Sequence, residues 1–246
     1  MVFQTEKGLV VPAVTAEQMR EIDRIAMEDF SLGILQMMEN AGRNLAQNVM
    51  DMLGADEPGR GSEIAVLAGA GGNGGGGICC ARHLHNRGFR VRLVLDREAG
   101  ALRGAAETQL QILRTAGLQS TVPAGAGEAI RGAKLVVDAL IGYSLRGVPR
   151  GRAAELIDLC NQHARRVLSL DVPSGLNATT GETLGTAIRP ERTLTLALPK
   201  TGLHGVPGDL YLADIGIPPQ VYEWLGLGTP SPFGKDYWIR LRSVAR

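Results

Sequence analysis

The chain has 246 residues, a length that suits one large domain or, less well, two small ones. Its 26 basic residues nearly balance its 25 acidic residues, so it lacks the basic excess that is typical of nucleic-acid binders. Its apolar runs are far shorter than a membrane span, and its first residues show no signal-peptide pattern. We therefore expect a cytoplasmic protein that binds neither nucleic acid nor membrane.

The cysteines and histidines give no sign of a disulfide framework or a metal site. Cys79, Cys80 and Cys160 form no C-x-x-C pair, and adjacent cysteines do not easily ligate one metal. We expect free thiols that serve as packing residues. The four histidines have no evident partners in the sequence, and we expect them to be structural or solvated.

The N-terminal part of the chain predicts two helices between residues 15 and 53. Thr15 and Gln18 have the spacing of a capping box, in which each side chain accepts a hydrogen bond from the other residue's backbone. Apolar residues then recur at helical spacing. A second helix is predicted from about Gly33 to Leu53, because apolar residues again fall on one face.

A polar break that starts at Ala55 is followed by alternating strand-like and helix-like segments. The expected strands cover residues 63–69, 89–96, 134–142, 166–175, 192–200 and 209–217, and the expected helices cover residues 78–88, 104–117, 125–133 and 153–164. This alternation predicts an α/β fold with a mainly parallel sheet and helices on both faces. We expect a single domain over residues 1–246, with its core over 62–219 and a peripheral tail over 226–246.

A glycine-rich loop follows the first strand of this alternation and precedes a helix that we expect to start near Ile78. In such a unit the free N–H groups at the helix start attract an anion, and glycine lets a ligand approach the backbone. The loop also satisfies G-x-G-x-x-G from Gly69 to Gly74, and Asp96 ends the next strand as a ribose-binding acid would. A phosphate-bearing ligand is the favoured interpretation. A tight turn that only allows close packing is the alternative.

Polar residues also follow three later strands. Asp138 and Asp171 each come directly after an apolar run, Ser174 follows in the turn SLDVPSG, and Lys200 ends another strand. Ligands of open α/β sheets bind outside the carboxyl ends of the strands, so we expect these groups and the glycine loop to share one rim. The alternative for each acid is a role in capping a helix or fixing a turn.

Six motifs in one order resemble the YjeF N-terminal domain family, the NAD(P)H-hydrate epimerases. They are MENAG, the glycine loop, VVDALIGYSLRG, SLDVPSGLN, LALPKTGL and GDLYLADIGIP, and they span roughly residues 14–219. The resemblance implies a Rossmann-like three-layer α/β/α sandwich, a homodimer, and the interconversion of the R and S epimers of hydrated NADH and NADPH. It also implies a separate NAD(P)H-hydrate dehydratase as a partner, because the family acts beside an enzyme that repairs one epimer.

The resemblance further implies the site residues. A potassium ion would be bound by Asn73, Asp138 and Ser174, and such an oxygen-only set suits a hard cation. Asp171 would contact the hydrated dinucleotide. The other residues expected to contact it are Gly72, Asn73, Gly74, Gly75, Gly76, Gly142, Tyr143, Ser144, Leu145, Arg146, Gly147 and Val148.

The implied reaction requires an acid and a base. Loss of the hydroxyl next to the ring nitrogen gives a planar iminium, and water that returns to the other face inverts the carbon. We assign Asp171 as the acid/base and Asp138 as the cation ligand that orients it, although the sequence leaves these roles interchangeable.

The glycine loop departs from the family pattern G-P-G-N-N-G-G-D-G, and two of the departures remove a side chain that would contact the ligand. Gly72 stands where the family has Asn, and Gly76 stands where it has Asp. Losing such contacts weakens binding by roughly tenfold to thousandfold. The main alternative is therefore a catalytically impaired dinucleotide- or nucleotide-binding family member. A partner-binding scaffold stays open, whereas an NAD-dependent oxidoreductase is disfavoured because no Tyr-x-x-x-Lys motif is present.

Overall fold

The computed structural model describes residues 2–54, 62–118, 120–121, 125–183 and 185–244. The strands are β1 (Val2–Thr5), β2 (Val10–Pro12), β3 (Glu63–Ala68), β4 (Arg90–Leu95), β5 (Ser120–Thr121), β6 (Leu135–Ala139), β7 (Val167–Leu170), β8 (Arg192–Leu196), β9 (Asp209–Ala213) and β10 (Trp238–Ser243). The helices are α1 (Ala16–Arg24), α2 (Ile34–Leu53), α3 (Gly72–His85), α4 (Gly104–Thr115), α5 (Ala126–Gly132), α6 (Gly151–His163) and α7 (Pro219–Trp224), with a π-helix η1 (Ile25–Asp29) and 3-10 turns η2 (Ala99–Ala101) and η4 (Thr201–Leu203).

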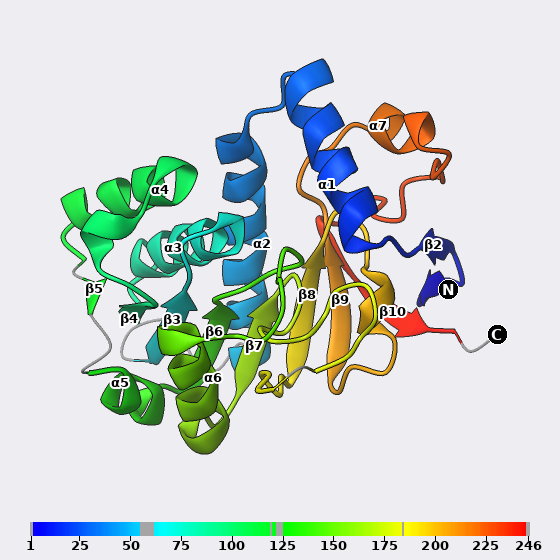
Figure 1. Ribbon diagram of the computed structural model, residues 1–246. Coiled ribbons are helices and arrows are strands. Elements are labelled where there is room, and N and C mark those ends of the chain that lie inside the picture. The colour runs from blue at the N-terminus through cyan, green and yellow to red at the C-terminus, as the bar shows by residue number, and fades with distance from the viewer. Residues whose placement is uncertain (1, 55–61, 119, 122–124, 184, 245–246) are drawn as a thin grey trace.

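One sheet with the order β2-β1-β10-β9-β8-β7-β6-β3-β4-β5 forms the centre of the molecule (Figure 1). The strands from β3 to β9 run parallel, as predicted, and β10, β1 and β2 are added antiparallel. The chain moves outward from β3 to β4 and β5, and then returns to place β6 on the other side of β3. The strand order therefore reverses between β3 and β6, which is where open α/β sheets bind ligands.

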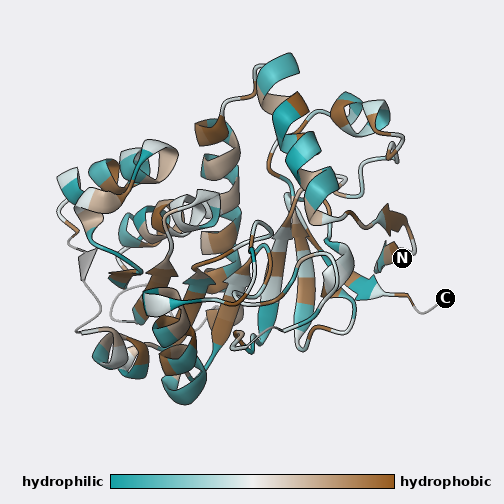
Figure 2. Ribbon diagram, viewed as in Figure 1, coloured by the Kyte–Doolittle hydropathy of each residue, from teal (hydrophilic) through white to brown (hydrophobic). Residues whose placement is uncertain are grey.

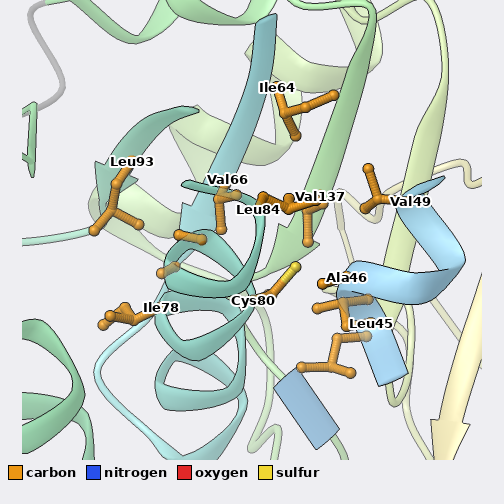
Figure 3. Packing of buried hydrophobic residues seen from close by; sticks show 14 of the residues in the cluster. Leu45, Ala46, Val49, Ile64, Val66, Ile78, Cys80, Leu84, Leu93 and Val137 are labelled. Carbon is orange, nitrogen blue, oxygen red and sulfur yellow. The ribbon is translucent and has the colours of Figure 1, made fainter. Parts of the chain in front are cut away.

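Strand β3 shows how the layers meet. Ile64 and Val66 lie in one buried cluster with Leu84 of α3 and Leu45 of α2 (Figure 3). Leu67 lies in a second cluster that contains residues of α5 and α6. Successive side chains of a strand point to opposite faces, so the two clusters occupy the two sides of the sheet. This confirms the predicted α/β/α layering, and Figure 2 shows hydrophobic residues concentrated in the central strands.

Helix α3 begins at Gly72, so the expectation that it would start near Ile78 was wrong. A Cβ at Gly74 would lie 1.7 Å from the backbone oxygen of Gly69, and a Cβ at Gly77 would lie 2.5 Å from a side chain of β6. Each helical glycine costs about 1 kcal/mol relative to alanine, which makes a glycine run resemble a loop in the sequence. Close packing of α3 on the sheet requires these glycines and offsets that cost.

Both helices predicted between residues 15 and 53 are present as α1 and α2. Thr15 caps α1, where its Oγ1 accepts a hydrogen bond from the Gln18 backbone at 3.2 Å and the Gln18 side chain accepts one from the Thr15 backbone at 2.9 Å. Helix α1 continues into η1, and α2 ends at Leu53. Most of the predicted polar break, residues 55–61, lies outside the described residues. No helix in the described part of the chain is long and apolar enough to cross a membrane.

The C-terminal segment enters the sheet, so the expectation of a peripheral tail was wrong for residues 238–243. Strand β10 pairs with β9 on one side and with β1 on the other, and both termini lie on the same side of the molecule (Figure 1). Leu241 of β10 and Phe3 of β1 are buried. The sequence signal was weak because β10 alternates imperfectly and pairs with a strand at the other end of the chain.

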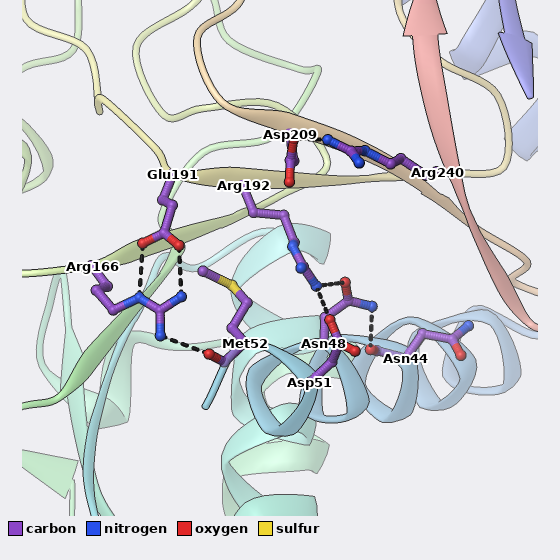
Figure 4. A network of polar contacts seen from close by, with 9 residues as sticks. All are labelled: Asn44, Asn48, Asp51, Met52, Arg166, Glu191, Arg192, Asp209 and Arg240. Atoms are coloured by element: carbon purple, nitrogen blue, oxygen red, sulfur yellow. Dashed lines mark hydrogen bonds and ion pairs between the residues drawn. The ribbon is translucent and has the colours of Figure 1, made fainter. Parts of the chain in front are cut away.

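A polar network joins the end of α2 to the amino ends of β7 and β8, opposite the carboxyl ends of the strands (Figure 4). Arg192 donates to the side chains of Asn48 at 3.1 Å and Asp51 at 2.7 Å. Arg166 donates to the backbone oxygen of Met52 at 2.6 Å. These contacts hold α2 against the sheet from the edge that carries no predicted site residue.

Candidate active site

A cavity of about 770 Å³ opens at the switch point between β3 and β6, a volume typical of small-molecule sites. Its wall combines the start of α3, the loop after β6, the ends of β7 and β8, and residues of α1 and α2. The predicted substrate contacts that line it are Gly72, Asn73, Gly76, Gly142, Tyr143, Ser144, Leu145, Val148 and Asp171. The predicted contacts that lie off its wall are Gly74, Gly75, Arg146 and Gly147.

Asp171 and Lys200 form a buried ion pair on this wall. Lys200 Nζ pairs with Asp171 Oδ1, and the two side chains are 1% and 4% exposed. Lys200 Nζ also donates to the backbone oxygen of Leu196 at 2.9 Å, and the backbone N–H of Tyr143 donates to Asp171 Oδ2 at 3.0 Å. The sequence placed Lys200 on the rim without giving it a role, and the structure makes it the partner of the predicted acid/base.

Backbone strain presents Asp171 to the cavity. Its φ of +66° lies in the left-handed region, which non-glycine residues seldom adopt, and the Val172 N–H bonds back to the Leu170 oxygen at 2.9 Å across it. This three-residue reversal is a γ-turn of the strained type. Ala197, at the end of the neighbouring strand, also has a positive φ of +63°. Such strain gathers at functional sites, where surrounding contacts hold it.

The segment before α1 fixes Lys200. Val14 bridges Lys200 as a short parallel pair, with its N–H donating to the Pro199 oxygen at 2.9 Å and its oxygen accepting from the Thr201 N–H at 2.9 Å. Thr15 then starts α1 directly after this bridge. The same backbone segment therefore places the Lys200 ammonium and the helix that covers the cavity.

Asp138 lies beneath the cavity wall rather than on it. Its carboxylate is fully buried and accepts hydrogen bonds from the Ser174 N–H (2.9 Å), the Ser174 hydroxyl (2.5 Å), the Ser169 hydroxyl (2.8 Å) and the Leu140 N–H (3.3 Å). Burial raises its pKa, and these hydrogen bonds oppose that shift. All of the donors are neutral, and among the described residues no cationic side chain forms an ion pair with it.

Asn73 turns toward the same point as Asp171. A Cβ on Gly142 would lie 3.1 Å from both Asn73 Oδ1 and Asp171 Oδ2, so both oxygens approach the Gly142 backbone, where only glycine fits without a shift. The Asn73 amide nitrogen is buried without a hydrogen-bond partner among the described residues. Amide oxygen and nitrogen exchange places by a flip, so this orphaned position can present the oxygen instead.

The predicted potassium ligands therefore fit a cation by their chemistry. Asn73 offers an amide whose buried nitrogen has no partner among the described residues. Ser174 offers a hydroxyl that donates to Asp138 and accepts from the Ile141 N–H at 2.8 Å. Asp138 brings a buried negative charge that has only neutral donors around it. Buried charges are normally paired with an opposite charge, and oxygen donors suit a hard cation.

Asp23 of α1 is a cavity residue that the sequence analysis missed. Its Oδ2 accepts a hydrogen bond from the Tyr143 hydroxyl at 2.6 Å. Burial raises the pKa of Asp23, against smaller lowering effects of Tyr143 and the nearby Lys200, whereas Asp171 adds to the rise. The helical spacing of α1 marked its apolar face only, so no sequence signal distinguished this acid from its exposed neighbours.

The two substituted positions of the glycine loop differ in the space around them. A Cβ at Gly72 would meet no atom within 4 Å, whereas a Cβ at Gly76 would lie 2.9 Å from the tip of Leu170. Both positions line the cavity. Asp96 also lines it, as predicted for the acid that ends the next strand, and is ion-paired with Arg97 at 2.8 Å.

A second polar cluster joins α2 to α3 away from the cavity. His83 Nε2 lies 2.8 Å from Glu39 Oε1, Cys79 Sγ lies 3.3 Å from Glu39 Oε2, and Arg82 pairs with the same carboxylate. Burial opposes the ionisation of Glu39, but its three partners outweigh burial and lower its pKa to about 2. We call this cluster of Glu39, Cys79, Arg82 and His83 the clamp between α2 and α3, and it agrees with the structural role expected for the histidines and cysteines. The Arg82 guanidinium supplies the positive charge that balances Glu39.

The fold and the site define a Rossmann-like α/β protein with a ligand cavity at its topological switch point. The family model of the YjeF-related protein N-terminus matches residues 34–202, and the chain belongs to this family. A solved structure, that of the yeast protein ynu0, has a TM-score of 0.81 at 24% identity and covers 94% of this chain and 100% of its own. At that identity the likeness confirms the fold alone.

Two relatives share the chain's length and one is longer. A protein from Dehalogenimonas lykanthroporepellens named NAD(P)H-hydrate epimerase is 48% identical over 97% of this chain and 96% of its own. A protein of the same name from Rhodopirellula baltica is 36% identical over 85% and 86%. The Bifunctional NAD(P)H-hydrate repair enzyme Nnr of Moorella thermoacetica is 36% identical over 85% of this chain and 41% of its own.

Proposed function

We propose that this chain is an NAD(P)H-hydrate epimerase, an isomerase that interconverts the R and S epimers of hydrated NADH and NADPH in metabolite repair. The observation that carries this proposal is the buried Asp171–Lys200 pair on the wall of the switch-point cavity. The name of the relative that is 48% identical over nearly the whole chain supports the choice of substrate.

The cavity suits a dinucleotide laid from the start of α3 toward Asp171. The free N–H groups at Gly72 and Asn73 begin the helix, and this is the position at which α/β proteins bind phosphate groups. The segment from Gly142 to Leu145 lines the wall between the helix start and Asp171. We therefore place the pyrophosphate at α3 and the hydrated nicotinamide beside Asp171.

The reaction proceeds by loss and return of water at one carbon. The ring nitrogen assists departure of the protonated hydroxyl, which leaves as water and gives an iminium cation. Water then adds to the opposite face and loses a proton, so the atoms and protons balance. Asp171 acts as the acid/base for this exchange, and Lys200 and the Tyr143 N–H hold its carboxylate in place. A negative carboxylate beside the ring also stabilises the cationic iminium.

A potassium ion is part of the proposal. Asn73, Asp138 and Ser174 would hold it. The support is the Asn73 amide nitrogen, which has no partner among the described residues, together with the buried Asp138 carboxylate, which has only neutral partners. The ion would compensate the charge of Asp138. Asp138 itself, which lies beneath the wall, orients the site rather than exchanging protons with the substrate.

The proposal extends to partners and location. Some family members are named bifunctional repair enzymes, and this chain matches 41% of the one from Moorella thermoacetica. We infer that a separate NAD(P)H-hydrate dehydratase consumes the epimer that this chain produces. We also infer a homodimer in the cytoplasm, from the resemblance of its motifs to the family.

A coupled assay tests the function. The R and S epimers of hydrated NADPH are supplied with potassium and an excess of an S-specific dehydratase, and the loss of the R epimer is followed. We expect the protein to accelerate that loss and Asp171→Asn to abolish the acceleration. Normal activity in a folded Asp171→Asn protein would refute the role of this carboxylate.

The second candidate is a family member that binds the dinucleotide without epimerising it. The glycines at 72 and 76 favour this candidate, because both line the cavity where the family carries polar side chains. Binding of hydrated NADPH by calorimetry without any acceleration in the coupled assay would establish it. Acceleration would exclude it.

A further inference from the structure

Asp23 is the second carboxylate beside the proposed reaction centre. Among the described residues, the acids on the cavity wall are Asp23, Asp96 and Asp171. Asp96 is paired with Arg97, and Asp171 is paired with Lys200. For Asp23 the structure shows no ion pair among the described residues, and its polar contact is the Tyr143 hydroxyl.

Tyr143 joins the two carboxylates from its opposite ends. Its backbone N–H donates to Asp171 Oδ2 at 3.0 Å, and its hydroxyl donates to Asp23 Oδ2 at 2.6 Å. Between them, the Lys200 ammonium lies 5.7 Å from the centre of the Tyr143 ring. Tyr143 therefore contacts one carboxylate with its backbone and the other with the end of its side chain, and both Tyr143 and Asp23 line the cavity.

The surroundings of the two acids differ, because Asp171 has a buried counterion and Asp23 contacts a neutral hydroxyl. Asp171 accepts a hydrogen bond from the Lys200 ammonium, which is its buried counterion. Burial raises the pKa of Asp23, which favours its protonated form. The titratable groups that face Asp23 and Tyr143 are Lys200, Asp171, Tyr222 of α7 and Arg20 of α1. Two carboxyl groups whose environments differ in this manner are the pattern of an acid–base pair.

We propose that Asp23 and Tyr143 form a proton relay that serves the hydroxyl group exchanged in the epimerisation, an inference that rests on the function proposed above. In the starting state of the relay Asp23 is protonated and is the donor of the 2.6 Å hydrogen bond to the Tyr143 oxygen, the reverse of the direction when Asp23 is ionised. The Tyr143 hydroxyl gives its own proton to the departing hydroxyl, which leaves as water, and takes the proton of Asp23. Asp23 becomes a carboxylate, and the C–O bond electrons leave with the water. When water adds to the other face, it loses its proton to Asp171. Asp171 then releases a proton to solvent and Asp23 takes one from solvent, which restores the starting state.

In this relay Tyr143 contacts the substrate and Asp23 acts through Tyr143. Asp23 is thus a positioning residue that holds the Tyr143 hydroxyl and also supplies it with a proton. An asparagine at 23 can still accept the hydrogen bond from the Tyr143 hydroxyl, but it cannot supply a proton. Asp23→Asn therefore separates the relay from a purely structural role.

The experiment compares kcat and KM of the full chain in the coupled assay for wild type, Asp23→Asn and Tyr143→Phe. General acid catalysis contributes roughly 10²–10⁴-fold, so we expect kcat to fall by about a hundredfold in both variants, with KM changed less than about threefold. The matched controls are Asp29→Asn, an exposed acid on η1, and Tyr237→Phe, a tyrosine that is 58% exposed. Both controls should keep wild-type kcat.

The outcomes separate the relay from the function. Wild-type protein without epimerase activity would overturn the proposed function and the relay together. Wild-type kcat in both Asp23→Asn and Tyr143→Phe would overturn the relay alone. A rise in KM without a fall in kcat would also overturn it, because that result assigns the pair to binding. Thermal unfolding of each variant shows whether it is folded, and Tyr143→Phe, which keeps the ring, tests the relay if Asp23→Asn is unstable.

Discussion

Lys200 is almost completely buried with its ammonium group against the Asp171 carboxylate, and the two residues follow the neighbouring parallel strands β8 and β7. Removing one member of such a pair leaves an uncompensated buried charge, which costs about 3–5 kcal/mol. Replacing both members removes the charge altogether. Comparing single and double variants of the pair therefore distinguishes its contribution to the free energy of unfolding from its contribution to catalysis.

The first prediction concerns this pair. Lys200→Met should lower the free energy of unfolding by about 3 kcal/mol and abolish epimerisation, because Asp171 loses its buried counterion. The double variant Lys200→Met/Asp171→Asn should recover part of the stability but none of the activity. Urea unfolding and the coupled assay measure the two properties. A Lys200→Met protein as stable and as active as wild type would contradict the role of the pair.

The second prediction concerns the open position in the glycine loop. Gly72→Asn restores the family side chain where a Cβ meets no atom within 4 Å, so the variant should fold normally and bind hydrated NADPH about tenfold more tightly. Gly74→Ala is the matched control, since its Cβ would lie 1.7 Å from a backbone oxygen and should strongly destabilise the protein. Calorimetric titration and thermal unfolding measure both effects. Unchanged affinity in Gly72→Asn would show that this position does not contact the ligand.

The third prediction concerns the proposed potassium ion. Replacing potassium with choline at constant ionic strength should lower both the melting temperature and the epimerase rate, because Asp138 loses its compensating charge. Asn73→Ala should raise the potassium concentration that gives half of the maximal thermal shift. The thermal shift is a readout that does not require catalysis. Equal melting temperatures in potassium and choline would contradict a potassium site.

The fourth prediction concerns pH and the clamp between α2 and α3. The pKa of Glu39 is lowered from 4.5 to about 2 in the folded protein, so its ionised form is favoured by folding. This contribution is fully present above pH 4.5 and is lost as the pH falls toward 2. The side chain is 43% exposed, so solvent screening reduces the contribution to about 1 kcal/mol. Glu39→Gln should lose about this amount at pH 7, and its deficit relative to wild type should shrink as the pH falls through this window. A deficit that does not change with pH would contradict the assignment.

Much of the fold could be predicted because its signals are local. The six predicted apolar runs correspond to strands β3, β4 and β6–β9, and the helices predicted between them correspond to α3–α6. These elements could be predicted because the hydrophobic pattern of neighbouring residues indicates secondary structure. The expectations for α3 and for the tail were wrong for one reason. Gly75, Gly76 and Gly77 of α3 and the strand β10 owe their structure to contacts with residues far away in the chain.

The sequence by itself determined the layered α/β class, the family, and the placement of Asn73, Asp171 and Lys200 at strand ends, because these follow from local pattern and motif. The tertiary structure alone decided which of the acids meet in the cavity. It placed Asp138 beneath the wall, paired Lys200 with Asp171, and brought Asp23 from α1 to the Tyr143 hydroxyl. These contacts join residues that are far apart in the chain, so local sequence patterns do not predict them. They depend on how the strands and helix α1 pack together.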